Sequence, residues 1–366
     1  MSTKVCILTS VHRWNDIRIF RKQAKSLVKA GYQVHLVVPT DESGVKDGVM
    51  LNPVVVPSGR LKRILLTTYK VYKEAKKTNA EIYHFHDPEL IFYAKLLSLQ
   101  GKKVIYDSHE DVPADILDKE WISNRYVRKA VSKLYGFVEK KLAKSFDGVI
   151  SVSYNITNKF TNANKATIAN VPLREEFKNV ENSGASKVGK RVVYAGGLTE
   201  ARNIKQIVQS AGYIKDKEIE IHLFGEFDNE AYKNECQSLQ EWGNVKYWGL
   251  KSTEEVYGFM QTCSLGLVMF KDIANHAFAI PNKAYEYMAA GIPLLISDLN
   301  FWKEHFEKMA YFVDPENPSA IALGIEAVFE NSLESNNIAA KNKELVASKM
   351  NWAEESKKLI NLYKSL

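Results

Sequence analysis

Three polar residues on one predicted helix could bind a phosphorylated nucleotide. The helix is expected to begin at Pro281, a residue favoured in the first position, and to end at Gly291. Asn282 and Lys283 precede Glu286 by four and three residues, so the three side chains share one face. Free N–H groups and the helix dipole at this end favour a phosphate, and Lys283 adds a full positive charge.

Glu286 would lie about 4.5–6 Å further along the helix axis, at ~1.5 Å per residue. This separation fits a pyrophosphate followed by a ribose, whose two hydroxyl groups need a bidentate acceptor. Hydrogen bonds to such a carboxylate contribute roughly 1.5–3 kcal/mol each. A surface helix with an ordinary Lys–Glu pair has the same spacing, so spacing alone leaves both interpretations open.

Histidines and acidic residues could instead hold a metal ion. His84 and His86 alternate along an expected strand and therefore point the same way, while His109 follows a separate strand. The sequence contains no H-E-x-x-H and no D-x-D motif, and the nearest approach to the latter is Glu226-Phe-Asp228. We therefore expect no metal site and no cofactor.

Short β-branched runs alternate with helical patterns through most of the chain, which predicts parallel sheets covered by helices on both faces. In the first half the expected strands are 4–10, 32–39, 51–57, 82–86, 102–107 and 148–153. In the second half they are 191–197, 219–225, 245–249, 263–270, 292–297 and 310–314. The predicted fold is α/β, with two Rossmann-like, doubly wound domains facing a cleft.

The domain boundaries follow from a loss of apolar periodicity at residues 174–190, which we expect to be a linker. The first domain would then span residues 1–173 and the second residues 191–350. Residues 351–366 form an amphipathic helix that could pack back on the first domain.

The bulk composition is that of a soluble two-domain protein. The chain has 366 residues, of which 45% are hydrophobic and 25% charged. Three widely spaced cysteines exclude a disulfide framework and fit a reducing compartment. No segment approaches the ~20 apolar residues that span a bilayer. We therefore expect a cytoplasmic protein that is not integral to a membrane.

Five segments resemble glycosyltransferase family 4. PNKAYEYMAAGIPLLISD at 281–298 resembles the family's donor-site segment, and VHRWNDIRIFRKQAKSLVKAGYQVHLVVP at 11–39 resembles its first loop and helix. The family's central pair of segments in the first domain is resembled by YHFHDPEL followed by VIYDSHED. Its first phosphate loop in the second domain is resembled by YAGGLTEARNIKQIVQSAG at 194–212. The resemblance implies the GT-B fold and transfer of a sugar with retention of the anomeric configuration.

The same resemblance implies roles for individual residues in binding a UDP- or GDP-sugar donor. Glu286 would bind the ribose hydroxyls and Arg202 the pyrophosphate, with Lys205 as a weaker candidate for the latter. His109 would lie near the transferred sugar. Backbone approach to the donor would use Gly196 and Gly197, and the base would be flanked by Trp248 and Leu250. Without a metal, Arg202 and Lys283 would stabilise the leaving nucleotide.

Two positions depart from the family pattern. The position eight residues before Glu286, where the family often has a second glutamate, is Phe278. Gly197 stands where the family usually has an arginine. We expect Asn282, Lys283 and the helix N–H groups to take over part of that work, and the identity of the sugar stays open.

Asp16 and Arg18 on the first loop are candidates for the acceptor side. Their types also fit a helix cap and a surface charge pair, and the sequence does not separate the two interpretations.

The first half of the chain is strongly basic. Residues 1–170 hold 28 Lys and Arg against 16 Asp and Glu, whereas the remainder holds 22 against 27. Segments 60–77 and 124–144 each predict a helix with apolar residues on one face and cations on the other. In the second, the expected buried stripe is Val127, Val131, Leu134, Val138 and Leu142. Its cations fit either a solvated face or peripheral contact with anionic lipid at the inner face of the cell membrane.

The sequence thus predicts a metal-independent hexosyltransferase that moves a sugar from a nucleoside-diphosphate donor to a glycan or lipid-linked acceptor in cell-surface polysaccharide synthesis. The alternatives are a nucleotide-sugar epimerase on the same fold, or a basic protein that binds nucleic acid or membranes. No nucleic-acid-binding module is evident, so we expect no nucleic acid partner.

Overall fold

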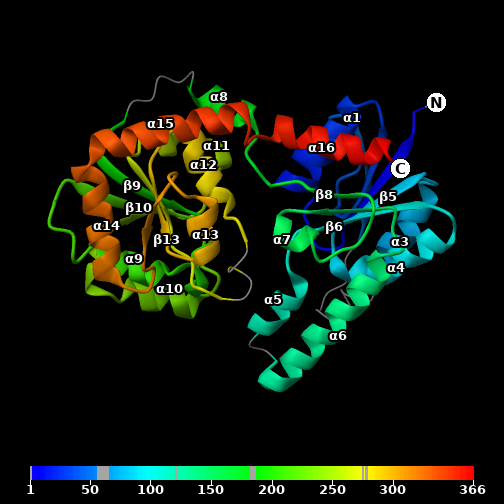
Figure 1. Ribbon diagram of the computed structural model, residues 1–366, viewed down its shortest axis with the longest axis horizontal. Coiled ribbons are helices and arrows are strands. Elements are labelled where there is room, and N and C mark those ends of the chain that lie inside the picture. The colour runs from blue at the N-terminus through cyan, green and yellow to red at the C-terminus, as the bar shows by residue number, and fades with distance from the viewer. Residues whose placement is uncertain (1, 56–65, 120–121, 182–186, 274–275, 277–278) are drawn as a thin grey trace. The chain divides into compact units, whose positions relative to one another are not determined.

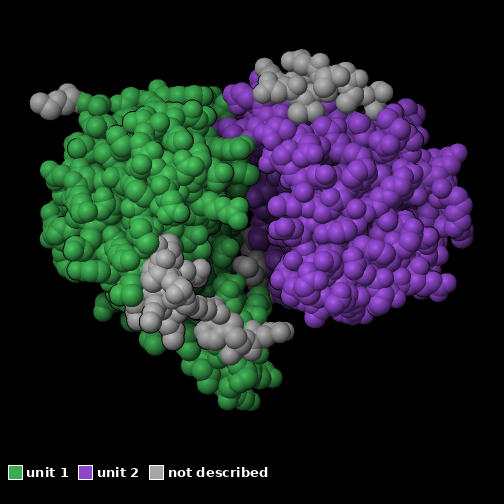
Figure 2. Space-filling view, turned by 180° about the vertical axis from the view of Figure 1, so that it is seen from behind, with its two compact units in different colours: residues 1–170, 353–366 green, residues 171–352 purple. Residues whose placement is uncertain are grey.

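The computed structural model describes residues 2–55, 66–119, 122–181, 187–273, 276 and 279–366 (Figure 1). The chain forms two compact units (Figure 2). Unit 1 combines residues 1–170 with 353–366, and unit 2 comprises residues 171–352. The chain therefore passes from one unit to the other twice.

The described part of unit 1 contains an eight-stranded sheet in the order β3-β4-β2-β1-β5-β6-β7-β8. Among the described strand pairs of this sheet, β3 and β4 are antiparallel and all the others are parallel. The strands are β1 (Lys4–Leu8), β2 (Gln33–Pro39), β3 (Gly44–Lys46), β4 (Val49–Val54), β5 (Ile82–Phe85), β6 (Lys103–Ser108), β7 (Gly148–Ser151) and β8 (Lys165–Thr167).

Helices cover both faces of this sheet. In Figure 1, α1 and α16 lie on one side, and α3, α4 and α6 lie on the other. The helices are the π-helix η1 (Ile17–Ala24), α1 (Lys25–Lys29), α3 (Thr68–Lys77), the short η3 (Pro88–Leu90), α4 (Ile91–Leu99), α5 (Val112–Asp118), α6 (Arg125–Ala143), α7 (Tyr154–Thr157) and α16 (Trp352–Lys364).

Unit 2 contains a six-stranded sheet in the order β11-β10-β9-β12-β13-β14, and its described strand pairs are all parallel. Its strands are β9 (Lys190–Ala195), β10 (Ile219–Phe224), β11 (Val245–Tyr247), β12 (Leu265–Val268), β13 (Leu294–Ser297) and β14 (Tyr311–Val313). Numbered from β9, this is the 3-2-1-4-5-6 order of doubly wound nucleotide-binding folds.

The helices of unit 2 also lie on both sides of the sheet, with α9 and α10 on one and α11, α12 and α15 on the other (Figure 1). They are α8 (Arg174–Glu181), η4 (Glu200–Arg202), α9 (Ile204–Ser210), α10 (Glu230–Gln237), η5 (Gln240–Asn244), α11 (Thr253–Gln261), α12 (Asn282–Ala290), α13 (Asn300–His305), α14 (Pro318–Glu330) and α15 (Ser332–Ser348).

Both sheets reverse their strand order at one point, between β1 and β5 in unit 1 and between β9 and β12 in unit 2. In open α/β sheets, ligands bind outside the carboxyl ends of the strands at such a point. The loops after β1, β5 and β9 are therefore where each unit is expected to carry a site.

The expected linker at 174–190 is wrong over its first half. Residues Arg174–Glu181 form α8, whose Phe177 is buried and stacks on Tyr257 with ring centroids 4.3 Å apart. The apolar face of this helix packs on the rest of unit 2. Unit 2 therefore begins at Val171 and not at residue 191. Residues 353–366 group with unit 1.

The expected buried stripe of α6 is wrong at three of its five positions. Val127, Val131 and Leu134 are 47%, 40% and 65% exposed. The helix packs instead through small or polar residues, and Ser132 Oγ donates to Pro113 O at 2.6 Å. A Cβ added at Gly136 would lie 3.2 Å from Pro113. Because α5 approaches this closely, the small-residue face turns inward and the bulky stripe faces outward.

Candidate active site

Helix α12 presents the predicted Asn282–Lys283–Glu286 face. It begins after Pro281, and Ala284 N donates to Pro281 O at 3.1 Å. Among the described residues no side chain caps this end, so the N–H groups of Asn282 and Lys283 are the ones that could bind an anion. It ends at Gly291, where φ is +72°. Lys283 Nζ forms an ion pair with the Glu286 carboxylate, whose side chain is 13% exposed. The structure therefore places an ammonium group directly beside a carboxylate on the predicted face.

Buried contacts fix α12 against the end of β9. The hydroxyl of Tyr287 accepts a hydrogen bond from Ala195 N at 2.9 Å. This ring fits only because Gly266 lies beneath it: a Cβ at that position would be 2.5 Å from the ring. On the other side, Trp302 Nε1 donates to Ala279 O at 2.7 Å and holds the chain that leads into the helix.

The glycine turn after β9 carries Arg202 over it. Arg202 Nη1 donates to Gly197 O at 3.4 Å, and its guanidinium lies 5.2 Å from the centre of the Phe270 ring. A Cβ at Gly196 or Gly197 would be 2.9 or 3.3 Å from Arg202 Nη1. Arg202 thus lies directly over both glycines of this turn.

A second loop approaches the same turn at Gly225. Its φ is +137°, and a Cβ built on it would lie 1.8 Å from Gly196 O. Only glycine fits this contact between two backbones. The turn after β9 and the loop after β10 are therefore packed as one rigid piece.

The remaining predicted donor residues lie on other elements of unit 2. Lys205 Nζ on α9 is paired with Glu235 at 2.6 Å. Trp248 stacks on Phe224 with centroids 5.7 Å apart and, like Leu250, remains exposed beyond the end of the edge strand β11. Phe278 lies outside the described residues.

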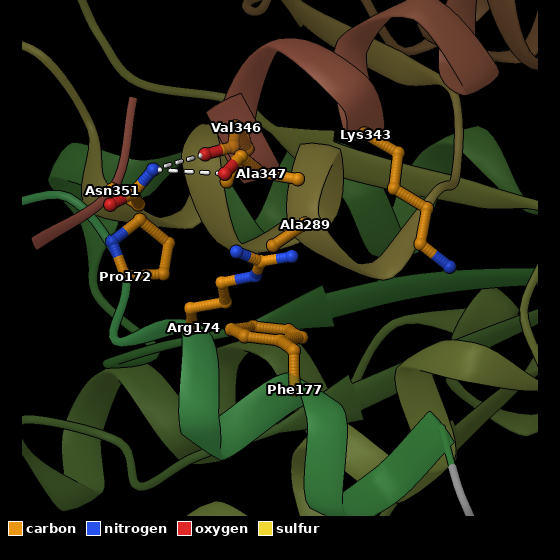
Figure 3. A pocket seen from close by; sticks show the side chains of 8 residues that line it. All are labelled: Pro172, Arg174, Phe177, Ala289, Lys343, Val346, Ala347 and Asn351. Atoms are coloured by element: carbon orange, nitrogen blue, oxygen red, sulfur yellow. Dashed lines mark hydrogen bonds between the residues drawn. The ribbon is translucent and has the colours of Figure 1, made fainter. Parts of the chain in front are cut away.

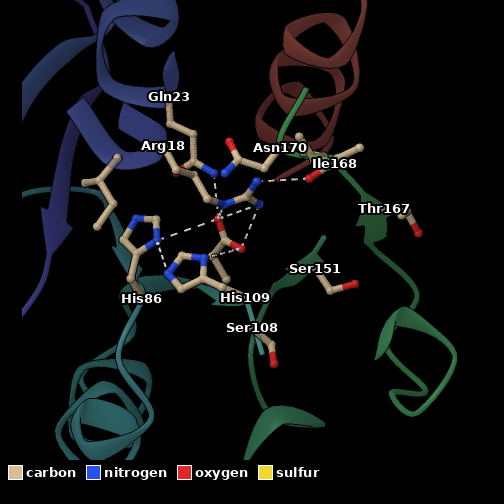
Figure 4. Close-up of polar contacts among 12 residues, drawn as sticks. Arg18, Gln23, His86, Ser108, His109, Ser151, Thr167, Ile168 and Asn170 are labelled. Atoms are coloured by element: carbon tan, nitrogen blue, oxygen red, sulfur yellow. Dashed lines mark hydrogen bonds and ion pairs between the residues drawn. The ribbon is translucent and has the colours of Figure 1, made fainter. Parts of the chain in front are cut away.

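In unit 1, three histidines stack in a row where β5 and β6 end, and Figure 4 shows two of them, His86 and His109. The rings of His84 and His86 have centroids 4.6 Å apart, as expected for alternate residues of one strand. The ring of His86 stacks on His109 at 4.9 Å, with Nδ1 of His86 3.2 Å from Nε2 of His109. His109 follows a different strand from this pair, as expected from the sequence, but its ring still joins the stack. Because β5 and β6 are neighbours, their carboxyl ends bring the histidines together.

Asp107 lies at the centre of the cluster and is fully buried. It accepts hydrogen bonds from Arg18 Nη2 at 3.0 Å and from Gln23 Nε2 at 2.5 Å. His109 Nδ1 is 3.4 Å from Oδ1, and His84 Nε2 is 3.7 Å from Oδ2. One carboxylate thus orients residues from η1, β5 and the loop after β6.

The protonation of this cluster follows from burial and charge. Burial favours the neutral acid at Asp107, but the positive charge of Arg18, with the N–H of His109 beside it, outweighs this effect and holds the pKa of Asp107 well below its usual range. Burial lowers the pKa of His84 and lowers that of His86 strongly. Asp107 is therefore an anion, and His84 and His86 are neutral near pH 7.

His84, His86 and Asp107 have atoms within 4.8 Å of one another and could in principle surround a metal ion. However, the guanidinium of Arg18 contacts both oxygens of Asp107, and Gln23 donates to one of them. These donors use the lone pairs that a cation would need. The residues therefore fit a hydrogen-bonded network better than a cation site.

His12 adds a cation beside His109. Its ring lies edge-on to that of His109 with centroids 5.6 Å apart. Its nitrogens are 3.5 Å from Asp16 Oδ2 and 3.3 Å from Asp87 Oδ1. The hydrogen bonds with Asp16 and then Asp87 raise the pKa of His12 to about 10. His12, in the loop after β1, is therefore a positively charged imidazolium at all pH values below about 10.

The two acceptor-side candidates have structural roles here. Asp16 Oδ1 caps η1 by accepting from Ile19 N at 2.8 Å, so the capping interpretation applies to it. Arg18 is only 6% exposed and also donates to Ile168 O at 3.0 Å, so it is neither an open acceptor contact nor part of a surface pair. The side chain of Arg18 points inward because its guanidinium pairs with the buried carboxylate of Asp107.

Asp107 was not predicted as a site residue, His86 was considered only as a possible metal ligand, and His12 and Tyr287 were not predicted either. A signal existed for the first two: an aspartate ends one expected strand, and histidines alternate on another. Asp16 lies only four residues from His12, but the second partner, Asp87, comes from the loop after β5, and no local pattern indicates that contact.

A separate pocket of about 90 Å³ lies in unit 2 at the far end of α12 (Figure 3). Figure 3 shows Arg174 extending toward Ala289 above the Phe177 ring. Asn351 Nδ2 closes one side by donating to Val346 O at 2.9 Å. The remaining wall is largely apolar, and the pocket shares no residue with the Lys283–Glu286 pair.

In the described part of the chain, no helix combines the length and apolar character needed to cross a bilayer.

Two family models match the chain, one in each half. Residues 18–167 match the model for Glycosyltransferase Family 4, and residues 175–345 match the model for Glycosyl transferases group 1. An uncharacterized glycosyltransferase of Methanocaldococcus jannaschii is 20% identical over 245 residues, or 66% of this chain. That match spans 58% of the relative's own length.

Solved structures of similar fold cover nearly the whole chain. Sucrose-phosphate synthase from Thermosynechococcus elongatus has a TM-score of 0.78 and 14% identity over 99% of this chain and 98% of its own. Anabaena HepE, in complex with UDP, has a TM-score of 0.72 and 14% identity over 100% of both chains. A trehalose-6-phosphate structure from E. coli, bound with UDP-2-fluoro glucose, has a TM-score of 0.73 and 11% identity over 100% of this chain and 99% of its own. At these identities the likeness establishes the fold, which is GT-B.

Proposed function

The chain belongs to glycosyltransferase family 4, and on this premise we propose that it transfers a sugar from a nucleoside-diphosphate donor to an acceptor hydroxyl. The observation that carries the proposal is the N-terminal half of α12, where free N–H groups, Lys283 and Glu286 follow one another. When the donor binds, the ammonium group of Lys283 breaks its ion pair with Glu286 and binds the diphosphate. The Glu286 carboxylate then accepts hydrogen bonds from the ribose hydroxyls.

UDP is the first candidate for the nucleotide, with GDP as the second. Support comes from the two structural relatives that contain UDP or a UDP-sugar analogue. The donor sugar is a hexose in this proposal, and the acceptor is a glycan or a lipid-linked saccharide used in cell-surface polysaccharide synthesis.

The proposed transfer retains the anomeric configuration and needs no metal. The bond between the anomeric carbon and the diphosphate oxygen breaks as the acceptor oxygen attacks from the same face. The acceptor proton passes to the departing phosphate oxygen. Arg202, Lys283 and the N–H groups of α12 stabilise the charge on that phosphate.

His109 is proposed to orient the transferred sugar. In this structure its Nε2 is 3.2 Å from His86 Nδ1, while its Nδ1 faces Asp107. Substrate would therefore have to replace His86 at Nε2, and Asp107 would keep the ring in place during the exchange.

Nucleotide release tests the proposal directly. The purified full-length chain is incubated with UDP-glucose, UDP-galactose, UDP-N-acetylglucosamine or GDP-mannose, without acceptor, with either EDTA or Mg²⁺. Slow release of UDP or GDP in both conditions is the expected result. Interconversion of the sugar without lasting nucleotide release would identify an epimerase instead, and release abolished by EDTA would reject the metal-independent mechanism.

We also propose that helix α6 docks on an anionic membrane, where a lipid-linked acceptor would lie. Its outward face exposes Tyr126, Val127, Val131, Leu134 and Phe137. The adjacent α4 exposes Phe92, Leu96 and Leu99. Exposed apolar rows of this size are typical of sites that bind a partner or a lipid surface.

Charge favours the lipid surface as the occupant. Exposed cations lie along the edge of the apolar row on α6, and these are Lys129, Lys133, Lys140 and Lys144. Each basic residue near an anionic surface contributes about 1 kcal/mol. An apolar row beside a basic one is the pattern of helices that lie in the membrane interface.

Vesicle sedimentation tests this surface. We expect binding to phosphatidylglycerol vesicles at low salt, weaker binding at high salt, and little binding to phosphatidylcholine. Leu134→Gln with Phe137→Gln should weaken binding strongly, whereas the control Leu323→Gln with Leu333→Gln, at exposed positions of unit 2, should not. If the α6 variant instead changes only the oligomeric state, the face joins two copies of the chain and the membrane proposal fails.

A further inference from the structure

The histidine stack of unit 1 continues beyond His84 to a tyrosine on the C-terminal helix. The hydroxyl of Tyr363 lies 2.8 Å from His84 Nδ1, and both side chains are buried. The contact joins residues 279 positions apart. We propose that Tyr363 is a positioning residue for His109 and acts through the rings of His84 and His86. This inference rests on the role proposed above for His109.

The direction of each hydrogen bond follows from the partners. Burial raises the pKa of Tyr363 well above its usual range, so its O–H remains protonated and donates to His84 Nδ1. A neutral His84 then carries its proton on Nε2, which faces Asp107 Oδ2 at 3.7 Å. Tyr363 therefore selects the tautomer of His84 that can interact with the central carboxylate.

The protonated ring nitrogens of His109 and His86 can be assigned in the same way. His109 Nδ1 faces Asp107 Oδ1 at 3.4 Å, so a proton on Nδ1 is favoured and Nε2 becomes the acceptor. His86 Nδ1 then donates to that Nε2 at 3.2 Å. His86 Nε2 is left without a proton. Like it, His84 Nε2 and His109 Nδ1 have no hydrogen-bond partner of normal geometry among the described residues, so both interact with Asp107 as longer contacts. One consistent set of tautomers thus runs from Tyr363 to the face of His109 that would meet the sugar.

Helix α16 holds the hydroxyl rigidly in place. Leu359 and Tyr363 are buried, and the Tyr363 ring contacts Tyr32 edge-on at 5.5 Å. Glu355 accepts a hydrogen bond from Ala169 N at 2.9 Å. Because these contacts fix the ring independently of its hydroxyl, Tyr363→Phe removes the donor and keeps the packing.

Loss of the hydroxyl should act on turnover and not on donor binding. Without a donor at Nδ1, His84 has no fixed tautomer, and its contact with Asp107 loosens. We expect kcat to fall roughly threefold to tenfold, as for one lost hydrogen bond. KM for the donor should stay unchanged, because the donor contacts of α12 lie in unit 2. The pH dependence of kcat should shift as well.

The matched control is Tyr106→Phe. Tyr106 is a buried tyrosine of unit 1 whose hydroxyl donates to Glu139 at 2.7 Å, with its ring stacked on Phe85 rather than on the histidines. Its substitution removes an equivalent hydrogen bond without touching the stack. We expect similar changes in thermal stability for both variants, but the change in the pH profile of kcat only for Tyr363→Phe.

Nitrogen NMR of ¹⁵N-histidine-labelled full-length protein gives a readout that does not need activity. Tyr363→Phe should alter the tautomer signals of His84, His86 and His109 and leave those of His35 and His305 unchanged. His84→Asn, which keeps an acceptor for the hydroxyl but interrupts the stack, should alter His86 and His109 in the same way. It also serves if Tyr363→Phe does not fold.

The outcomes separate cleanly. If the signals of His109 stay unchanged in both variants, or if Tyr363→Phe matches Tyr106→Phe in every kinetic property, the positioning role is overturned. If wild-type protein releases no nucleotide while the three histidine signals still change together, the coupling stands and the proposed function fails.

Discussion

The guanidinium of Arg18 contacts both carboxylate oxygens of Asp107, with Nη2 3.0 Å from Oδ1 and 3.1 Å from Oδ2, and both side chains are buried. The pair joins η1 to the end of β6. It supplies the fixed cation that keeps Asp107 ionised beneath the histidines.

Removing Arg18 should therefore be costly. Arg18→Met leaves a buried, uncompensated carboxylate, and we expect a loss of about 3–5 kcal/mol in the free energy of unfolding. Urea denaturation measures it. Adding Asp107→Asn to that variant should restore part of the loss. As a control, Lys303→Met breaks the exposed pair with Asp298 and should leave the unfolding midpoint unchanged.

Glu286 should matter for the donor and not for the fold. Charge-assisted hydrogen bonds to the ribose contribute roughly 1.5–3 kcal/mol each, so Glu286→Gln should lower kcat/KM by about ten- to a hundredfold. Nucleotide release at varied donor concentration measures this. Glu230→Gln alters another Lys–Glu pair three residues apart in unit 2 and should have no effect. Equal activity of both variants would remove Glu286 from the donor site.

The contact between Gly225 and Gly196 should be intolerant of a single methyl group. Gly225→Ala would place its Cβ 1.8 Å from Gly196 O, so one of the two loops must move. We expect a marked fall in melting temperature together with weaker nucleotide binding. At Gly243 a Cβ meets nothing within 4 Å, and Gly243→Ala should preserve both properties. Calorimetry with and without UDP compares the two.

The stability of unit 1 should depend on the ionisation of Glu139. Burial raises the pKa of Glu139 to about 7, so the protonated form is favoured in the folded protein. Its contribution to stability is fully present below the ordinary glutamate pKa and is lost as the pH rises through about 7. Glu139→Gln, which stays neutral, should resemble wild type near pH 4.5 and be more stable by on the order of 1–3 kcal/mol near pH 8. Thermal melts at the two pH values test the sign, and an equal difference at both would contradict it.

Several elements were predictable because their signals are local. Strands such as β1 and β13 are continuous apolar runs, as parallel strands buried on both faces must be. The short strands β3 and β8 were missed because each has three residues, and they lie at the two ends of the sheet with little burial. Helix α12 and its polar face were predictable for the same reason, since a helical face depends only on spacing.

The histidine cluster depends on long-range contacts that no local pattern contains. Asp107 meets Arg18 across 89 positions, and His84 meets Tyr363 across 279. The orientation of α6 depends in turn on the neighbouring α5, whose Pro113 leaves room only for small residues such as Gly136. An apolar stripe shows that a helix has two faces, but the side chains of its neighbours decide which face turns inward.

The order in which the chain is synthesised gives the contact between Tyr363 and His84 a temporal meaning. Residues 1–170 leave the ribosome first, and the helix that completes their histidine stack follows only after all of residues 171–352. At about 5–20 residues per second, this interval lasts roughly 10–40 s. During that time the groove for α16 is empty and Leu359 and Tyr363 have not yet covered it. The hydrogen bond that Tyr363 donates to His84 can therefore form only after residues 171–352 have been made.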